Sequence, residues 1–144
     1  MLHHNLEIHQ RENEGIVILD LAGKLVMGAG DIALTGCVRS LFGNQNRQLI
    51  LNMAGASEID TSGMGALLIL AEEYRNAGGK MVLYNIAHSH GKVYEMARLE
   101  TAIEIYRDEL DAINSFFPDR KVIRYDILEY VEGQASHDDK SHKT

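Results

Sequence analysis

Two adjacent hydroxyl side chains are the groups in this sequence best placed for chemistry. Thr61 and Ser62 follow Asp60 at the point where an apolar segment with helical periodicity begins. The first turn of a helix has unpaired backbone amides and the positive end of the helix dipole, so a phosphate on either hydroxyl would be tolerated there. Such a phosphate adds a charge of about −1.5 to −2, which can block a docking surface without refolding the chain.

The same residue types also suit a purely structural role. Asp60, Thr61 and Ser62 are all favourable N-cap residues, and Gly63 and Gly65 permit close packing of a helix. Capping explains the residue types but not their number. The segment itself therefore leaves the phosphorylation and capping interpretations open.

The apolar pattern predicts the elements that position this segment. Residues 6–21 indicate a β-hairpin with its turn at 12–15, and Leu49-Ile50-Leu51 indicates a central strand buried on both faces. One helix is predicted from an N-cap at Asp31 to about residue 42. A second is predicted from Asp60 to about residue 77, with these side chains facing inward: Met64, Leu67, Leu68 and Ala71.

The remaining elements complete an α/β fold. They are a strand at 81–86, a short helix at 88–97, a strand at 102–106 and a helix from Asp108 to about Phe117. Strands that alternate with helices after a hairpin predict a mixed four- to five-stranded sheet flanked by about four helices. We expect one domain at 1–117, an extension at 118–132 that packs on it as a strand or short helix, and a disordered tail at 133–144.

Composition excludes several classes of protein. The chain has 144 residues, of which 45% are hydrophobic and 24% charged, values typical of a single globular domain, and its apolar runs are too short to cross a bilayer. The N-terminus does not resemble a secretory signal, and the single cysteine, Cys37, is predicted to be a core thiol. We therefore expect a cytoplasmic protein without membrane insertion.

The net charge argues against nucleic acid as a partner. The formal charge is −7, and the 14 Lys and Arg residues are scattered, whereas duplex binding needs a basic surface. A protein or a small molecule is the expected partner.

No cofactor, metal or catalytic group is predicted. Gly28-x-Gly30-x-x-Ala33 imitates a dinucleotide fingerprint, but Asn52 and Met53 stand where an acidic ribose ligand is needed. A flexible loop and a helix cap explain the glycines. His88 and His90 have no nearby cysteine and fit a polar loop better than a metal site, so an enzyme or ligand sensor is the weakest hypothesis.

The segment from Ile59 to Leu68 resembles the signature of the STAS family of anti-sigma factor antagonists. In that signature a strand runs into Asp-Ser-Ser-Gly-Leu-Gly or a near variant, and this chain reads Asp60-Thr61-Ser62-Gly63-Met64-Gly65. The resemblance covers roughly residues 6 to 116. Further features follow in family order: the opening hairpin with Gly23, the strand at 49–53, the Gly78-Gly79 turn, the strand at 81–86 and the helix at 93–99.

The resemblance implies a bacterial regulator of transcription that works by partner switching. In this scheme the dephosphorylated antagonist binds an anti-sigma factor that is also a serine/threonine kinase, and so releases the sigma factor. Phosphorylation of the hydroxyl after the motif Asp abolishes binding, and a PP2C-type phosphatase restores it. That hydroxyl corresponds to Thr61, with Ser62 as the fallback acceptor. The implied partner-binding residues are Asp60, Thr61, Ser62, Gly63 and Met64.

Three positions depart from the family pattern. This chain reads Gly23-Lys24-Leu25-Val26 where members often read Gly-Glu-Leu-Asp, and it has Asn52 where an Asp is common. The alternative function is a constitutive STAS subunit of a larger assembly, such as a lipid-transport ABC complex or a stressosome-like scaffold. In that role the hydroxyls would serve only as helix caps.

Overall fold

The structure of the protein is a computed structural model that describes residues 6–86 and 99–122. Its elements in chain order are β1 (Leu6–Asn13), β2 (Ile16–Leu25), α1 (Ala29–Gly43), β3 (Gln48–Ile59), α2 (Thr61–Asn76), β4 (Lys80–Tyr84), β5 (Ile105–Tyr106) and α4 (Glu109–Asn114). The short helix predicted at 88–97 lies outside the described residues.

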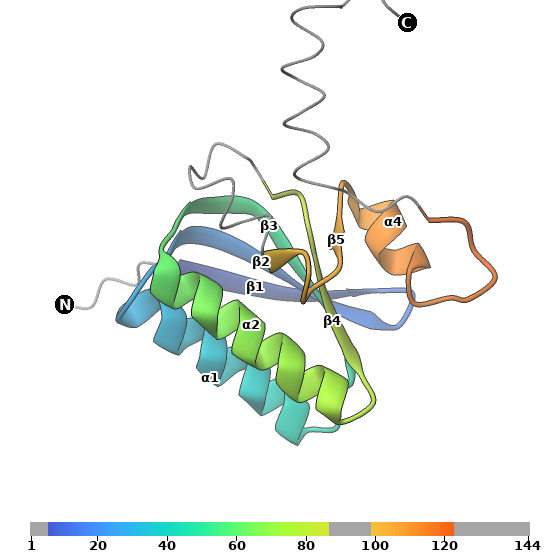
Figure 1. Cartoon of the computed structure of the whole chain (residues 1–144), viewed down its shortest axis with the longest axis horizontal. Helices are drawn as coiled ribbons and strands as arrows, with labels where there is room; N and C mark the ends of the chain where they lie inside the picture. Colours follow the sequence, from blue (N-terminus) through green and yellow to red (C-terminus); the bar gives the residue numbers. More distant parts are fainter. Residues whose placement is uncertain (1–5, 87–98, 123–144) are drawn as a thin grey trace, which may run out of the picture.

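The strands form one five-stranded mixed sheet in the order β1-β2-β3-β4-β5 (Figure 1). β1 and β2 form the antiparallel hairpin, and the remaining neighbours pair in parallel. Helices α1 and α2 lie side by side against one face of this sheet. The predicted α/β class with a mixed sheet is confirmed.

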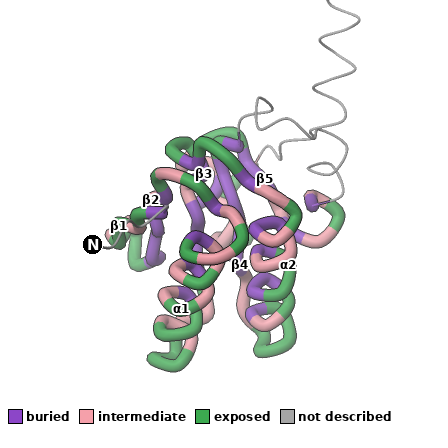
Figure 2. Tube along the Cα trace, turned by 90° about the vertical axis from the view of Figure 1, so that its left-hand side faces the viewer, coloured by how far each residue is buried: buried purple, intermediate pink, exposed green. Residues whose placement is uncertain are grey.

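The core lies on both faces of the sheet, and β3 runs through its middle. Leu49, Ile50 and Leu51 have no exposed surface, which confirms the central strand. Leu49 and Leu51 pack toward α1 and α2, and Ile50 packs on the opposite face under α4. In Figure 2 the buried residues follow the strands and the sheet-facing sides of the helices.

Several predicted boundaries were wrong. β3 extends to Ile59 because its polar and glycine-containing second half still pairs with β2, through two register shifts. α1 begins at Ala29 because the chain reverses at Gly28, whose φ of 100° suits glycine. Asp31 therefore lies in the first turn of the helix, where its side chain accepts a hydrogen bond from the Gly28 amide. The strand predicted at 102–106 contains only Ile105 and Tyr106, and α4 ends at Asn114.

The inward face of α2 also differs from the prediction at one position. Leu68 is 37% exposed, whereas Leu67, Leu70 and Tyr74 are buried. The buried face of α2 therefore includes Leu67, Leu70 and Tyr74 and leaves Leu68 outside. The reason is that α1 packs beside α2 and covers Leu70 and Tyr74.

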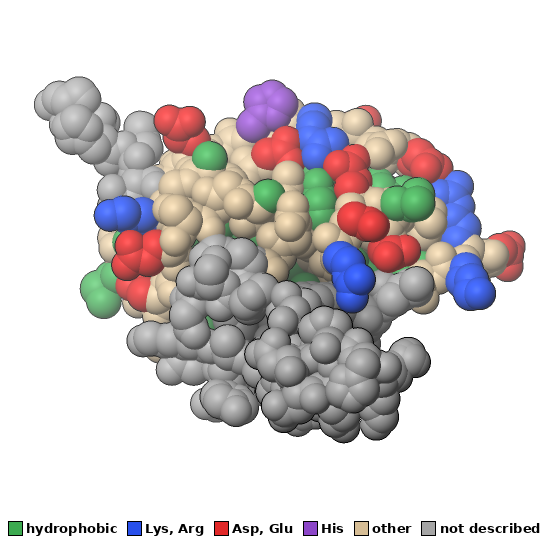
Figure 3. All heavy atoms as spheres, turned by 90° about the horizontal axis from the view of Figure 1, so that it is seen from above, with side chains coloured by type: hydrophobic (Ala, Val, Ile, Leu, Met, Phe, Trp, Pro, Cys, Tyr) green, Lys and Arg blue, Asp and Glu red, His purple; other side chains and the backbone are tan. Residues whose placement is uncertain are grey.

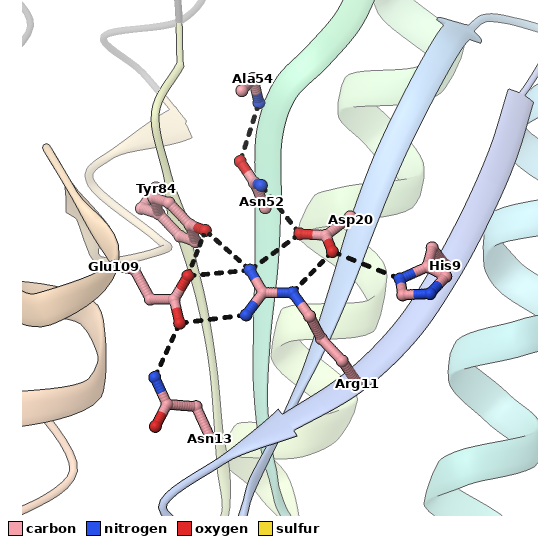
Figure 4. A network of polar contacts seen from close by, with 8 residues as sticks. All are labelled: His9, Arg11, Asn13, Asp20, Asn52, Ala54, Tyr84 and Glu109. Carbon is pink, nitrogen blue, oxygen red and sulfur yellow. Dashed lines mark hydrogen bonds and ion pairs between the residues drawn. The ribbon is translucent and has the colours of Figure 1, made fainter.

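A polar network ties α4 to the sheet face opposite α1 and α2 (Figure 4). At its centre Arg11 donates to Asp20 (Nε–Oδ2, 2.7 Å) and to Glu109 (Nη2–Oε1, 2.8 Å), which lies 98 residues away. Tyr84 donates to Glu109, and Asn52 donates to Asp20. This contact explains why the chain has Asn52 where the family commonly has Asp. An Asp at this position would put a second carboxylate against Asp20, whereas the amide of Asn52 donates a hydrogen bond to it.

The ionisation of Glu109 makes the stability of the fold depend on pH. Its hydrogen bond from Arg11, helped by Asn13 and Tyr84, lowers its pKa to about 2. Because the folded pKa lies below the unfolded value, this stabilisation is complete above about pH 4.5 and is lost as the pH falls toward 2. We expect the wild-type free energy of unfolding to fall by about 1 to 2 kcal/mol more than that of Glu109→Gln between pH 5 and 2.

Urea unfolding at several pH values measures this difference. Glu72→Gln, on the exposed side of α2, is the matched control and should follow the wild type. Parallel curves for wild type and Glu109→Gln would show that the network does not hold α4.

The chain after α4 returns to the tip of the β1–β2 hairpin. Arg120 pairs with Glu14 (Nη2–Oε1, 2.9 Å) and covers the ring of Phe117 at 4.0 Å. Phe116, Phe117 and Val122 pack against the apolar residues beneath α4. Of the predicted extension at 118–132, the structure describes residues 118–122.

Candidate functional site

The turn between β3 and α2 is held by Asp60. One carboxylate oxygen accepts the Gly63 amide at 2.8 Å, which makes Asp60 the N-cap of α2. The other accepts the Met27 amide at 3.0 Å, and the Asp60 amide donates to the Leu25 carbonyl. The bonds from the Met27 and Gly63 amides lower the pKa of Asp60. Asp60 thus joins the β2–α1 loop to the start of α2 as a carboxylate.

Thr61 and Ser62 are the first two residues of α2, directly after the cap. Thr61 is exposed and Ser62 is half-buried. Because Asp60 supplies the side-chain cap, neither hydroxyl is needed for it. The arrangement leaves both hydroxyls at a helix N-terminus, where backbone amides and the helix dipole favour an anionic group.

This assignment of the cap predicts unequal effects on stability. Asp60→Ala removes the cap and the tie to Met27, and it should lower the melting temperature by several degrees. Ser62→Ala removes neither and should melt close to the wild type. Thermal unfolding followed by circular dichroism distinguishes them. An equal loss in both variants would show that Ser62 shares the capping role.

The two motif glycines have different surroundings. A Cβ atom on Gly63 would lie 2.1 Å from the Leu25 carbonyl oxygen and 2.9 Å from Leu25 Cγ. A Cβ on Gly65 would meet nothing within 4 Å. Gly30 on α1 resembles Gly63, because a Cβ atom on Gly30 would lie 2.3 Å from the Lys24 carbonyl oxygen. The end of β2 therefore accepts the first turns of both helices only because glycine stands at each contact.

Two of the predicted partner-binding residues face the core. Met64 is 7% exposed and packs in the main cluster, and Gly63 is buried against Leu25. Met64 therefore offers little surface to a partner in this conformation, because its side chain packs in the core. Asp60, Thr61 and Ser62 remain at the surface.

Exposed apolar side chains lie near these hydroxyls, and the exposure of Ile32 and Ile69 was not predicted from the sequence. Met27 is 71% exposed, Ile32 70%, Ile69 55% and Leu68 37%. A groove of about 310 Å³ lies between α1 and α2, and Ser62 and Ile69 are among its lining residues. A signal was present, because Ile32 and Ile69 interrupt the polar side of their helices.

The groove is bridged by an ion pair from helix to helix. Arg39 of α1 donates to both carboxylate oxygens of Glu73 on α2, at 3.2 and 2.6 Å. Arg39 also lines the groove. The pair neutralises the one cationic side chain among the lining residues.

Other candidate chemistry finds little support within the described residues. In the ranges 6–86 and 99–122, no three His, Cys, Asp or Glu side chains are placed to hold a metal ion. His88 and His90 lie outside these ranges. No described helix is both long and apolar enough to cross a membrane. On the face shown in Figure 3, the described Lys and Arg side chains stand among Asp and Glu side chains and form no basic patch.

Comparisons with known proteins find matches over most of the chain. A family model for the STAS domain matches residues 7–112. An anti-sigma F factor antagonist of Paenibacillus polymyxa is 23% identical over 109 residues, which cover 76% of this chain and 93% of that protein.

Solved structures share the fold. An anti-sigma factor antagonist from Mycobacterium paratuberculosis superposes with a TM-score of 0.67 at 12% identity, over 76% of this chain and 92% of that one. The phosphorylated form of the Bacillus cell fate determinant SpoIIAA gives a TM-score of 0.58 at 20% identity, over 76% and 99%.

Proposed function

Because this chain belongs to the STAS domain family, we propose that it is an anti-sigma factor antagonist whose partner binding is controlled by phosphorylation of Thr61. The dephosphorylated protein binds an anti-sigma factor and so releases a sigma factor. Phosphorylation ends this binding. The chain acts in the cytoplasm by binding and not by catalysis.

The position of Thr61 is the observation that carries the proposal. Its side chain is exposed at the first residue of α2, and Asp60 already caps the helix. A phosphate can therefore be added without breaking the cap or displacing a core residue. The added charge of about −1.5 to −2 changes the surface that a partner meets, while the fold beneath it stays the same.

The partner that fits this scheme is an anti-sigma factor with serine/threonine kinase activity. It would transfer the γ-phosphoryl group of ATP to the Thr61 oxygen and release ADP, and a PP2C-type phosphatase would hydrolyse the phosphothreonine. The Paenibacillus relative is an anti-sigma F factor antagonist, which supports an anti-sigma factor as the partner. Ser62 is the fallback acceptor, one residue further into the helix.

Capture of the partner tests the proposal. The tagged protein is purified from its host, half is treated with phosphatase, and both halves are immobilised and exposed to the same host lysate. The treated half should retain an ATP-binding anti-sigma factor, identified by mass spectrometry, and the untreated half should retain much less.

Two results would contradict the proposal. One is equal capture of the anti-sigma factor by both halves. The other is stable recovery of the protein within a transporter or a large scaffold, whatever its phosphorylation, which would favour the constitutive-subunit alternative.

A further inference from the structure

We propose that Gly65 keeps the groove between α1 and α2 open to receive an apolar side chain of the anti-sigma factor kinase. The inference rests on the function proposed above and adds a specific contact to it. The binding surface would then extend from Thr61 along α2, beyond the hydroxyls themselves.

Gly65 has no steric reason to be glycine within the described fold. Gly63 would clash with Leu25 if it carried a Cβ, whereas a Cβ on Gly65 finds open space. Glycine inside a helix is destabilising relative to alanine, because the unfolded chain gains conformational freedom. Gly36 on α1 has equally open surroundings, but only the open space at Gly65 is part of the groove between the two helices.

The open space above Gly65 belongs to the α1–α2 groove. Its lining includes Thr35 of α1 and Ser62, Gly65 and Ala66 of α2, so small side chains form much of its surface. Its volume of about 310 Å³ lies at the lower end of the range for ligand pockets. A groove of this size accommodates one or two protruding side chains.

The character of the groove favours an apolar occupant. Ile69 lines it and is 55% exposed, and Ile32 on the neighbouring helix is 70% exposed. The charged groups in the lining are engaged within the chain: Arg39 with Glu73, and Asp31 with the Gly28 amide. Exposed apolar side chains on both helices, with these charges already paired, match a hydrophobic contact.

The groove also lies within reach of a protein that acts on Thr61. A standard interface buries about 800 Å² per partner, which corresponds to a patch with a radius of about 16 Å. From Thr61 to Ile69 the rise along α2 is about 12 Å. A kinase that centres on Thr61 therefore covers the groove, and Ser62 connects the two because it lines the groove directly after Thr61.

Gly65→Ala tests this role, and Gly36→Ala is its matched control. Both glycines lie within helices and have nothing within 4 Å of a built Cβ, but only Gly65 lines the groove. Both variants should melt at or above the wild-type temperature, which shows that they fold. The readouts are the phosphorylated fraction of each variant expressed in the host, by intact mass, and its affinity for the anti-sigma factor captured by the wild type.

We expect Gly65→Ala to bind at least tenfold more weakly and to carry less phosphate, and Gly36→Ala to match the wild type within twofold. Ile69→Ser, a change at an exposed position, should also weaken binding. Wild-type affinity and phosphorylation of Gly65→Ala would overturn the groove contact while leaving the proposed function intact. A wild type that neither carries phosphate nor captures an anti-sigma factor would overturn both.

Discussion

Replacing Gly63 by alanine is expected to lower the free energy of unfolding by about 3 kcal/mol. The new Cβ would lie 2.1 Å from a backbone carbonyl oxygen of Leu25, and a backbone atom cannot rotate away as a flexible side chain can. The first turn of α2 must then move off β2. This movement also strains the bond between the Asp60 amide and the Leu25 carbonyl.

Urea unfolding with Gly65→Ala as the control measures this effect. The control makes the same substitution two residues later in the same helix, where the space is open, and alanine there should be neutral or stabilising by up to about 1 kcal/mol. If the two variants were equally stable, the close contact between α2 and the end of β2 would not exist in solution.

Thr61→Asp is expected to weaken binding to the anti-sigma factor by about 100-fold, or about 2.7 kcal/mol. The carboxylate places a negative charge on the exposed first residue of α2 and so reproduces part of the phosphate. Thr61→Ala lacks the acceptor and should bind like the dephosphorylated protein. Titration calorimetry with the captured anti-sigma factor gives the three affinities.

Thr61→Asn is the matched control for charge. Asn has almost the shape of Asp and a similar helix propensity, so it isolates the effect of the negative charge. It should bind within a few-fold of Thr61→Ala. Equal affinities for the Asp, Asn and Ala variants would mean that charge at Thr61 does not regulate the partner.

The sequence predicted those parts of the fold that depend on local pattern. The apolar run Leu49-Ile50-Leu51 identified the central strand, since a short run that is apolar at consecutive positions between polar loops is typical of a strand covered on both faces. Asp60 and Asp108 were both expected at helix starts, and both are N-caps. The order of the described elements along the chain followed from these local signals.

Features that depend on neighbours distant in sequence were not predictable. Gly55 and Glu58 do not look like strand residues, yet β3 continues through them because β2 pairs alongside. Asp31 has the residue type of an N-cap, but the reversal at Gly28 starts the helix earlier. Leu68 follows helical periodicity and is exposed, because α1 beside α2 determines which side of α2 is buried.

The candidate site shows the same division. The motif identified Asp60 and the two hydroxyls as candidate site residues. All three residue types suit an N-cap, and only the hydrogen bond from the Gly63 amide to the Asp60 carboxylate assigns the cap to Asp60. The glycines at 63 and 65 are equivalent in sequence, and only their distances to Leu25 separate them. The network of Arg11, Asp20 and Glu109 joins residues too far apart for any spacing rule.

Phosphorylation of Thr61 is tested most directly by intact mass and site mapping of the protein purified from its host, with and without phosphatase treatment. The predicted result is one phosphate on Thr61 that phosphatase removes and that is missing from Thr61→Ala. An unmodified Thr61 under several growth conditions, or a phosphate on Ser62 with Thr61 unmodified, would contradict the assignment of Thr61 as the switch.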